Sequence, residues 1–136
     1  MARGKSKHPT GQELEILKVL WERSPLAVRE VREAMAAAGR ELAHTTLITT
    51  LGVMERKGFV RKRKGKGRGY EFSPKVTREE VSQGMVGDLL DRVFEGSASA
   101  LVLSLLENEQ LDAKEHEELK KAIRRYRKER KEEENA

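Results

Sequence analysis

The segment 44–58 constrains the fold of this chain more than any other stretch. It reads HTTLITTLGVMERKG, and its apolar residues recur at the i, i+4 and i+7 positions of one helix face. This inner stripe consists of Leu47, Leu51 and Met54. We expect a helix that His44 or Thr45 opens and that Gly58 closes in the left-handed conformation.

The opposite face of this helix is unusual for a helix selected only for stability. It carries four threonines and Gly52, and each of these costs a helix a few tenths to about 1 kcal/mol. Short side chains let a helix approach another surface closely, and threonine binds phosphates and base edges. We therefore interpret the segment as the recognition helix of a helix-turn-helix, and the alternative is a core helix with a tolerant surface. The expected DNA contacts are Thr45, Thr46, Thr49, Thr50, Val53, Arg56 and Lys57.

A β-hairpin with a basic tip is expected directly after this helix. Phe59-Val60 begins one strand, and Tyr70 and Phe72 alternate with a polar residue as in a half-buried strand. Three glycines in the tip let the backbone approach a duplex, so the hairpin resembles the wing of a winged helix. The side chains expected to neutralise phosphates are Lys62, Arg63, Lys64, Lys66 and Arg68. The alternative is a solvated, flexible charge run.

Two helices are expected before the recognition helix. Residues 10–13 form a T-x-x-E capping box that opens the first, and Ser24-Pro25 ends it, with Trp21 in the core. The second covers residues 26–39. Residues 1–9 are basic and without periodicity, so we expect a disordered arm there and a DNA-binding domain over residues 10–75.

The rest of the chain is expected to be a helical dimerisation domain over residues 76–126, followed by a charged, fraying tail at 127–136. A second T-x-x-E box lies at 77–80, and a third helix starts at Asp112. About sixty residues bury too little surface to fold alone, and segment 100–106 is apolar nearly all round, so a two-fold dimer is the simplest remedy. The alternative is that these helices fold back on residues 10–72. The expected dimer contacts are Val81, Met85, Leu89, Val93, Phe94, Leu101, Val102, Leu105, Leu119 and Ile123.

The charge of the chain is divided between these two halves. Residues 1–75 carry 17 Lys and Arg against 8 Asp and Glu, whereas residues 76–136 carry 11 against 15. This division suggests that the first half meets a polyanion. The 136-residue chain has no cysteine and no apolar run long enough to span a membrane, so we expect a cytoplasmic protein. The histidines are scattered, and we expect no enzyme, metal or cofactor.

The order of these motifs resembles the penicillinase-repressor family of the BlaI/MecI/CopY type. The resemblance rests on segments 13–22 (ELEILKVLWE), 28–31 (VREV), 45–51 (TTLITTL), 54–60 (MERKGFV) and 70–74 (YEFSP). It implies a mainly α fold, with an N-terminal winged helix-turn-helix, a small β-hairpin wing and a C-terminal three-helix dimerisation region. It also implies repression through palindromic operators, with Thr46 and Thr49 at the DNA. The copper-responsive branch has a C-terminal cysteine cluster, which this chain lacks.

The resemblance further implies a route of release. Family members leave DNA when a membrane metalloprotease sensor leads to a cut in the dimerisation region, typically between Asn and Phe. The matching place here carries Ser104 and Leu105. Two other hypotheses remain open: a winged helix that binds a protein partner, and an architectural DNA binder that does not select a sequence.

Overall fold

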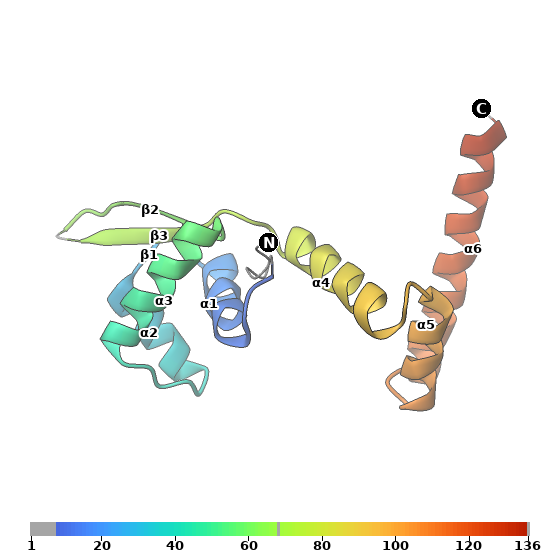
Figure 1. Ribbon diagram of the computed structural model, residues 1–136, viewed down its shortest axis with the longest axis horizontal. Helices are drawn as coiled ribbons and strands as arrows, with labels where there is room; N and C mark the ends of the chain where they lie inside the picture. The colour runs from blue at the N-terminus through green and yellow to red at the C-terminus, as the bar shows by residue number, and fades with distance from the viewer. Residues whose placement is uncertain (1–7, 68, 136) are drawn as a thin grey trace. The chain divides into compact units, whose positions relative to one another are not determined.

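The computed structural model describes residues 8–67 and 69–135 (Figure 1). The chain divides into two compact units, residues 1–87 and 88–136. The division falls within a helix, α4 (Arg78–Val93), rather than at Pro74, where the composition changes. The domain boundaries expected from the sequence therefore stay a prediction.

The first unit is three helices packed against a small antiparallel sheet. Its elements are α1 (Gly11–Glu22), β1 (Leu26–Ala27), α2 (Val28–Ala37), α3 (His44–Lys57), β2 (Val60–Lys64), β3 (Tyr70–Pro74) and the beginning of α4. The strand order is β1-β3-β2, and β2 and β3 form the long hairpin that projects from the helices in Figure 1. This is the winged-helix arrangement that the sequence predicts.

The capping box of α1 forms as expected. The Thr10 hydroxyl accepts from the Glu13 backbone N–H at 3.2 Å, and the Glu13 carboxylate accepts from the Thr10 backbone N–H at 2.8 Å. The disordered arm that we expected over residues 1–9 lies mostly outside the described residues. Of these residues only His8 and Pro9 are described, and Pro9 is buried.

The first strand is a feature that the sequence did not reveal. We expected a helix from residue 26, but Leu26 pairs with Phe72 and Ala27 pairs with Glu71 in β3. Helix α2 therefore begins at Val28. The Glu30 carboxylate accepts from the Ala27 backbone N–H at 2.8 Å and supplies part of the cap that an alanine side chain cannot provide.

The apolar core lies between α1, α2, α3 and the sheet. Its buried members are Ile16, Leu17, Leu20, Leu26, Val31, Met35, Leu47, Leu51, Met54, Phe59, Val60, Phe72 and Val81. Trp21 packs at the edge of this core, where its indole N–H donates to the Val76 carbonyl at 2.9 Å. The Arg78 guanidinium lies 4.9 Å from the centre of the same ring. The segment after the hairpin is therefore fixed to α1.

The second unit consists of the end of α4, α5 (Ala98–Glu107) and α6 (Ala113–Asn135). The expected caps form at Ser97, which accepts from the Ala100 backbone N–H, and at Asp112, which exchanges hydrogen bonds with Glu115. Helix α6 runs to Asn135, so the fraying tail expected from residue 127 is instead helical. No described residue of α5 or α6 is buried.

Candidate nucleic-acid interface

Helix α3 has the inner face that its sequence predicts. Leu47, Leu51 and Met54 are completely buried. Gly58 ends the helix with φ +84°, a conformation that glycine adopts without steric cost. The helix begins at His44, one of the two residues expected to open it, but its N-cap is Ala43 and no side chain caps it.

The outer face of α3 carries three threonines whose hydroxyls are free. Thr45, Thr46 and Thr49 are exposed, and these hydroxyls form no hydrogen bond within the described residues. Arg56 lies on the same face, because 3.6 residues per turn place it two turns beyond Thr49. Val53 is half-buried beside them. Together these residues present three hydroxyl groups, the methyl groups of threonine and valine, and the guanidinium of Arg56 to a partner.

Gly52 lies at the edge of this outer face, on the side of α3 that is turned toward the hairpin. A Cβ atom added there would meet only the Arg56 Nη1 atom, at 3.8 Å, which is ordinary contact. Its φ is not positive, so neither crowding inside the domain nor backbone conformation requires a glycine. Glycine in a helix interior costs about 1 kcal/mol relative to alanine. The missing side chain therefore favours close approach by something outside the domain.

Thr50, which we expected at the interface, is engaged inside the domain. Its hydroxyl donates to the Thr46 carbonyl at 2.8 Å and accepts from the Gln12 amide at 3.0 Å. Both the donor and one acceptor site of the hydroxyl are thus used in joining α3 to α1. We do not keep Thr50 among the DNA contacts.

Lys57 is engaged in the same way. Its ammonium lies 3.1 Å from both carboxylate oxygens of Glu13, a residue that is only 3% exposed. The side chain of Lys57 is 22% exposed. Since Glu13 also caps α1, this pair joins the start of α1 to the end of α3. We therefore expect Lys57 to stabilise the domain rather than to neutralise a phosphate.

The β2–β3 hairpin presents its basic residues on two faces. The register pairs Arg63 with Glu71 and Lys64 with Tyr70, so alternate side chains of β2 point to opposite sides of the sheet. Arg63, Lys64 and Lys66 are exposed and make no ion pair within the described part of the chain. Arg68 lies outside the described residues. The hairpin tip closes through the Gly65 N–H, which donates to the Gly69 carbonyl at 3.1 Å.

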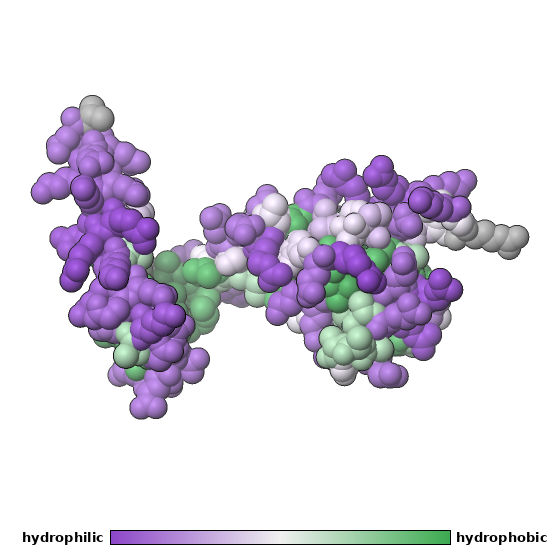
Figure 2. Space-filling view, turned by 180° about the vertical axis from the view of Figure 1, so that it is seen from behind, coloured by the Kyte–Doolittle hydropathy of each residue, from purple (hydrophilic) through white to green (hydrophobic). Residues whose placement is uncertain are grey.

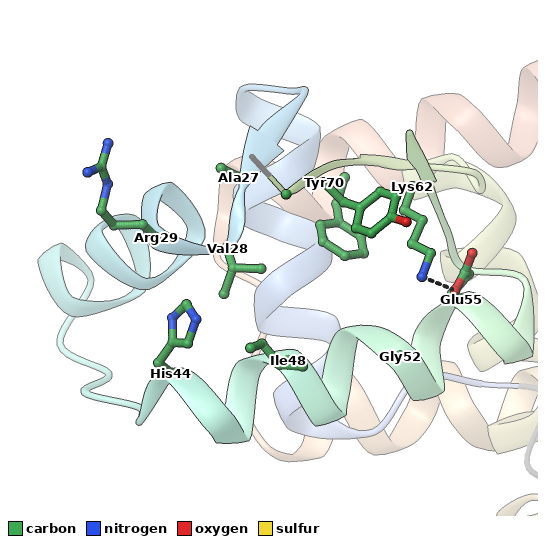
Figure 3. A pocket seen from close by; sticks show the side chains of 11 residues that line it. Ala27, Val28, Arg29, His44, Ile48, Gly52, Glu55, Lys62 and Tyr70 are labelled. Atoms are coloured by element: carbon green, nitrogen blue, oxygen red, sulfur yellow. Dashed lines mark ion pairs between the residues drawn. The ribbon is translucent and has the colours of Figure 1, made fainter. Parts of the chain in front are cut away.

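Lys62 differs from its basic neighbours, because it turns toward α3. Its ammonium lies 3.8 Å from the Glu55 carboxylate, and this ion pair is the dashed line in Figure 3. The ammonium also lies 4.5 Å from the centre of the Tyr70 ring. Both partners of the ion pair are well exposed, so the pair contributes little to stability. It is a contact between β2 and α3.

A groove separates α3 from the wing, and sequence reasoning missed it. Its lining residues are Ala27, Val28, Arg29, His44, Ile48, Gly52, Glu55, Lys62, Gly69, Tyr70 and Phe72. Figure 3 shows the side chains of Ile48, Val28 and Tyr70 turned toward this groove. Ile48 is 50% exposed although it neighbours the buried stripe. A β-branched apolar side chain beside free threonine hydroxyls can contact a thymine methyl group.

The residues expected in a dimer interface lie mostly at the surface. Met85, Leu89, Val93, Leu105 and Ile123 are exposed, and the remaining members are half-buried apart from one. That one is Val81, which is 8% exposed and packs in the core of the first unit. It is therefore not available to a second copy. The half-buried members are Phe94, Leu101, Val102 and Leu119.

The described part of the chain has no group of metal ligands and no membrane-spanning helix. Among residues 8–67 and 69–135, His, Asp and Glu form no group of three that could hold a metal ion. No helix within these ranges is long and apolar enough to cross a membrane. Ser104 and Leu105 lie inside α5, in helical backbone.

Comparison with known proteins matches residues 9–125 to the family model described as penicillinase repressor. A penicillinase repressor of Bacillus licheniformis is 28% identical over 120 residues, which cover 88% of this chain and 92% of that protein. The transcriptional regulator BlaI of Mycobacterium tuberculosis (strain ATCC 25618 / H37Rv) is 31% identical over 113 residues, or 82% of this chain and 79% of that one. The PcaV transcriptional regulator of Streptomyces coelicolor, solved with its natural ligand, aligns with a TM-score of 0.46 at 19% identity, over 90% and 77% of the two chains.

Proposed function

This chain belongs to the penicillinase repressor family, and on that premise we propose that it is a homodimeric repressor that binds palindromic operator DNA. Helix α3 enters the major groove and reads base edges. The hairpin of β2 and β3 lies along the neighbouring backbone and neutralises phosphates. Each copy supplies one such DNA-binding unit, which consists of α3 and the hairpin.

The observation that carries this proposal is the pattern of free and engaged groups on α3. The hydroxyls of Thr46 and Thr49 face solvent without a partner, whereas the chemically identical hydroxyl of Thr50 is used inside the domain. Free short hydroxyls, a glycine and an exposed isoleucine suit a surface that must lie close to base edges. The unpaired basic side chains of the wing supply the salt-dependent part of the affinity.

The proposed dimer is supported by the surface of the second unit. Helix α5 is strongly apolar, yet none of its residues is buried. Leu103 is 57% exposed, and Val93 at the end of α4 is 62% exposed. Exposed apolar surface of this density suits a self-complementary interface. Two copies would hold their recognition helices one helical turn of DNA apart, roughly 34–36 Å.

Loss of the dimer is then the route by which the repressor leaves its operator. A single DNA-binding unit keeps its own contacts with DNA. It loses the increase in affinity that comes from two linked units, which amounts to orders of magnitude. A cut between Ser104 and Leu105 would divide α5 and remove α6 from the dimer interface. This route involves the membrane metalloprotease sensor that the family resemblance implies.

The test begins with selection of binding sites from a random duplex library by the full-length protein. We expect an inverted repeat whose half-sites are centred about one turn apart. Thr49→Val keeps the shape of the side chain and removes its hydroxyl, so it should change the preferred base at one position of each half-site, by about 1–3 kcal/mol. Lys64→Gln should weaken binding to all duplexes alike.

Thr50→Val is the matched control. It removes the same hydroxyl group one position along the helix, where that hydroxyl bonds Thr46 and Gln12. It should lower stability without changing the preferred sequence. If Thr49→Val and Thr50→Val gave the same base preferences as the wild type, α3 would not be the reading element. A monomer in solution, or a selection that enriched no sequence, would also overturn the proposal.

A further inference from the structure

The longest helix of the second unit carries a face of basic side chains. Between residues 120 and 131, α6 has eight Lys and Arg against the single acidic residue Glu129, although residues 76–136 as a whole are net acidic. At 3.6 residues per turn, seven of the eight fall within about half of the helix circumference. We call these seven residues the α6 basic face: Lys120, Lys121, Arg124, Arg125, Arg127, Lys128 and Lys131.

Among the residues that the structure describes, the α6 basic face has almost no partners. Lys120 lies 3.8 Å from the Glu117 carboxylate, and both side chains are exposed. The other six members make no ion pair within the part of the chain that the structure describes. Like charges also stand four residues apart along the face, as in Arg124 and Lys128, and such pairs destabilise a helix. A helix selected only for stability would alternate acidic with basic residues.

The α6 basic face points away from the apolar stripe of the same helix. Helical spacing places Leu119, Ile123 and Tyr126 on the side opposite to Arg124. If the stripe is covered by a second copy, as the proposed function requires, the basic face stays open to solvent. Figure 2 shows the corresponding end of the molecule coated with hydrophilic side chains.

We infer that the α6 basic face is a second nucleic-acid-binding surface, which takes the phosphate backbone of duplex DNA without regard to sequence. The side chains of the face are all lysine and arginine, which neutralise the phosphates that supply sequence-independent affinity. From Lys120 to Lys131 it spans about 16 Å at 1.5 Å per residue, long enough to face several phosphates. A membrane-surface helix would need its apolar side for insertion, and the proposed dimer uses that side.

The test measures how the affinity of the full-length protein for a random duplex depends on salt. In Arg124→Gln/Arg127→Gln/Lys131→Gln, the slope of log K against log salt should fall by about 0.9 for each lost phosphate contact. Affinity at low salt should fall at least tenfold. The ratio of operator to random-duplex affinity should stay unchanged, because the lost contacts carry no sequence information.

A matched variant controls for net charge. Lys18→Gln/Arg23→Gln/Arg92→Gln removes three exposed positive charges, none of which lies on α6, and should keep the wild-type slope. A third variant, Arg124→Lys/Arg127→Lys/Lys131→Arg, keeps the charge and should also keep the slope. Circular dichroism checks that α6 remains helical, and removing like charges should preserve it.

Three results would overturn the inference. The first is a glutamine variant with the slope of the wild type, and the second is a charge control that loses as much slope as the glutamine variant. The third is reduced binding of the glutamine variant to vesicles of anionic lipid with an unchanged DNA slope, which would assign the face to a membrane. The inference stands apart from operator reading, because a wild type that selected no operator could still show the slope difference.

Discussion

Replacing Lys57 with methionine should lower the free energy of unfolding of the first unit by about 2–3 kcal/mol. Removing one partner of a buried ion pair costs about 3–5 kcal/mol, because the remaining charge is left unpaired away from water. Two features reduce that figure here. The side chain of Lys57 is 22% exposed, so water can replace part of the interaction that its ammonium makes with the Glu13 carboxylate. The carboxylate also keeps the hydrogen bond from the Thr10 backbone N–H.

A substitution of the other partner, Glu13, separates the energy of the ion pair from the energy of the helix cap. In Glu13→Gln the amide oxygen can still accept from the Thr10 backbone N–H, so the cap survives while the ion pair is lost. The double variant Glu13→Gln/Lys57→Met should be less destabilised than the two single variants together. The coupling energy from this cycle should be about 1–2 kcal/mol.

Urea unfolding followed by tryptophan fluorescence is the assay, at one fixed protein concentration. Trp21 is the sole tryptophan of the chain and sits against the Val76 carbonyl, so its signal reports the first unit. Lys64→Met is the control, since it removes an exposed lysine without an ion pair. A Lys57→Met protein with unchanged stability and weakened operator binding would refute the reasoning, because it would return Lys57 to the DNA.

Three further outcomes follow from the interface. Gly52→Ala should stabilise the free protein by up to about 1 kcal/mol while weakening operator binding, and stability and affinity that rise together would contradict close approach at this position. Gly58→Ala should destabilise the domain by about 1 kcal/mol in thermal unfolding, because φ +84° strains any residue with a Cβ, and an unchanged midpoint would count against that strain. Glu55→Gln frees the Lys62 ammonium and removes a negative charge beside the groove, so binding of any duplex should tighten severalfold, and weaker binding would indicate that Lys62 needs its partner.

The parts of the fold set by local chemistry could be predicted from the sequence. A side chain and a backbone group three residues apart determine the caps at Thr10, Thr77 and Asp112, and all three form. Gly58 could be assigned to the left-handed region from its place after the last apolar residue. The short strand β1 could not, since Leu26 and Ala27 become a strand only through pairing with β3, and two residues show no alternation.

The parts of the site set by distant contacts were missed for the same reason. The roles of Thr50 and Lys57 depend on Gln12 and Glu13, which lie 38 and 44 residues away along the chain. Helical periodicity places Thr50 and Lys57 at the edge of the outer face but does not say what stands opposite. Ile48 was missed because we expected an apolar side chain beside the buried stripe to be covered, and the groove leaves it exposed.

The absence of buried residues in α5 and α6 has a consequence for gene dosage. If two chains must meet before either second unit has an interior, the amount of competent repressor follows the square of the chain concentration whenever dimers are scarce. Halving synthesis would then leave about one quarter of the assembled form. Transcription controlled by such a protein would switch over a narrow range of repressor concentration. This steepness would not require cooperativity between separate operators.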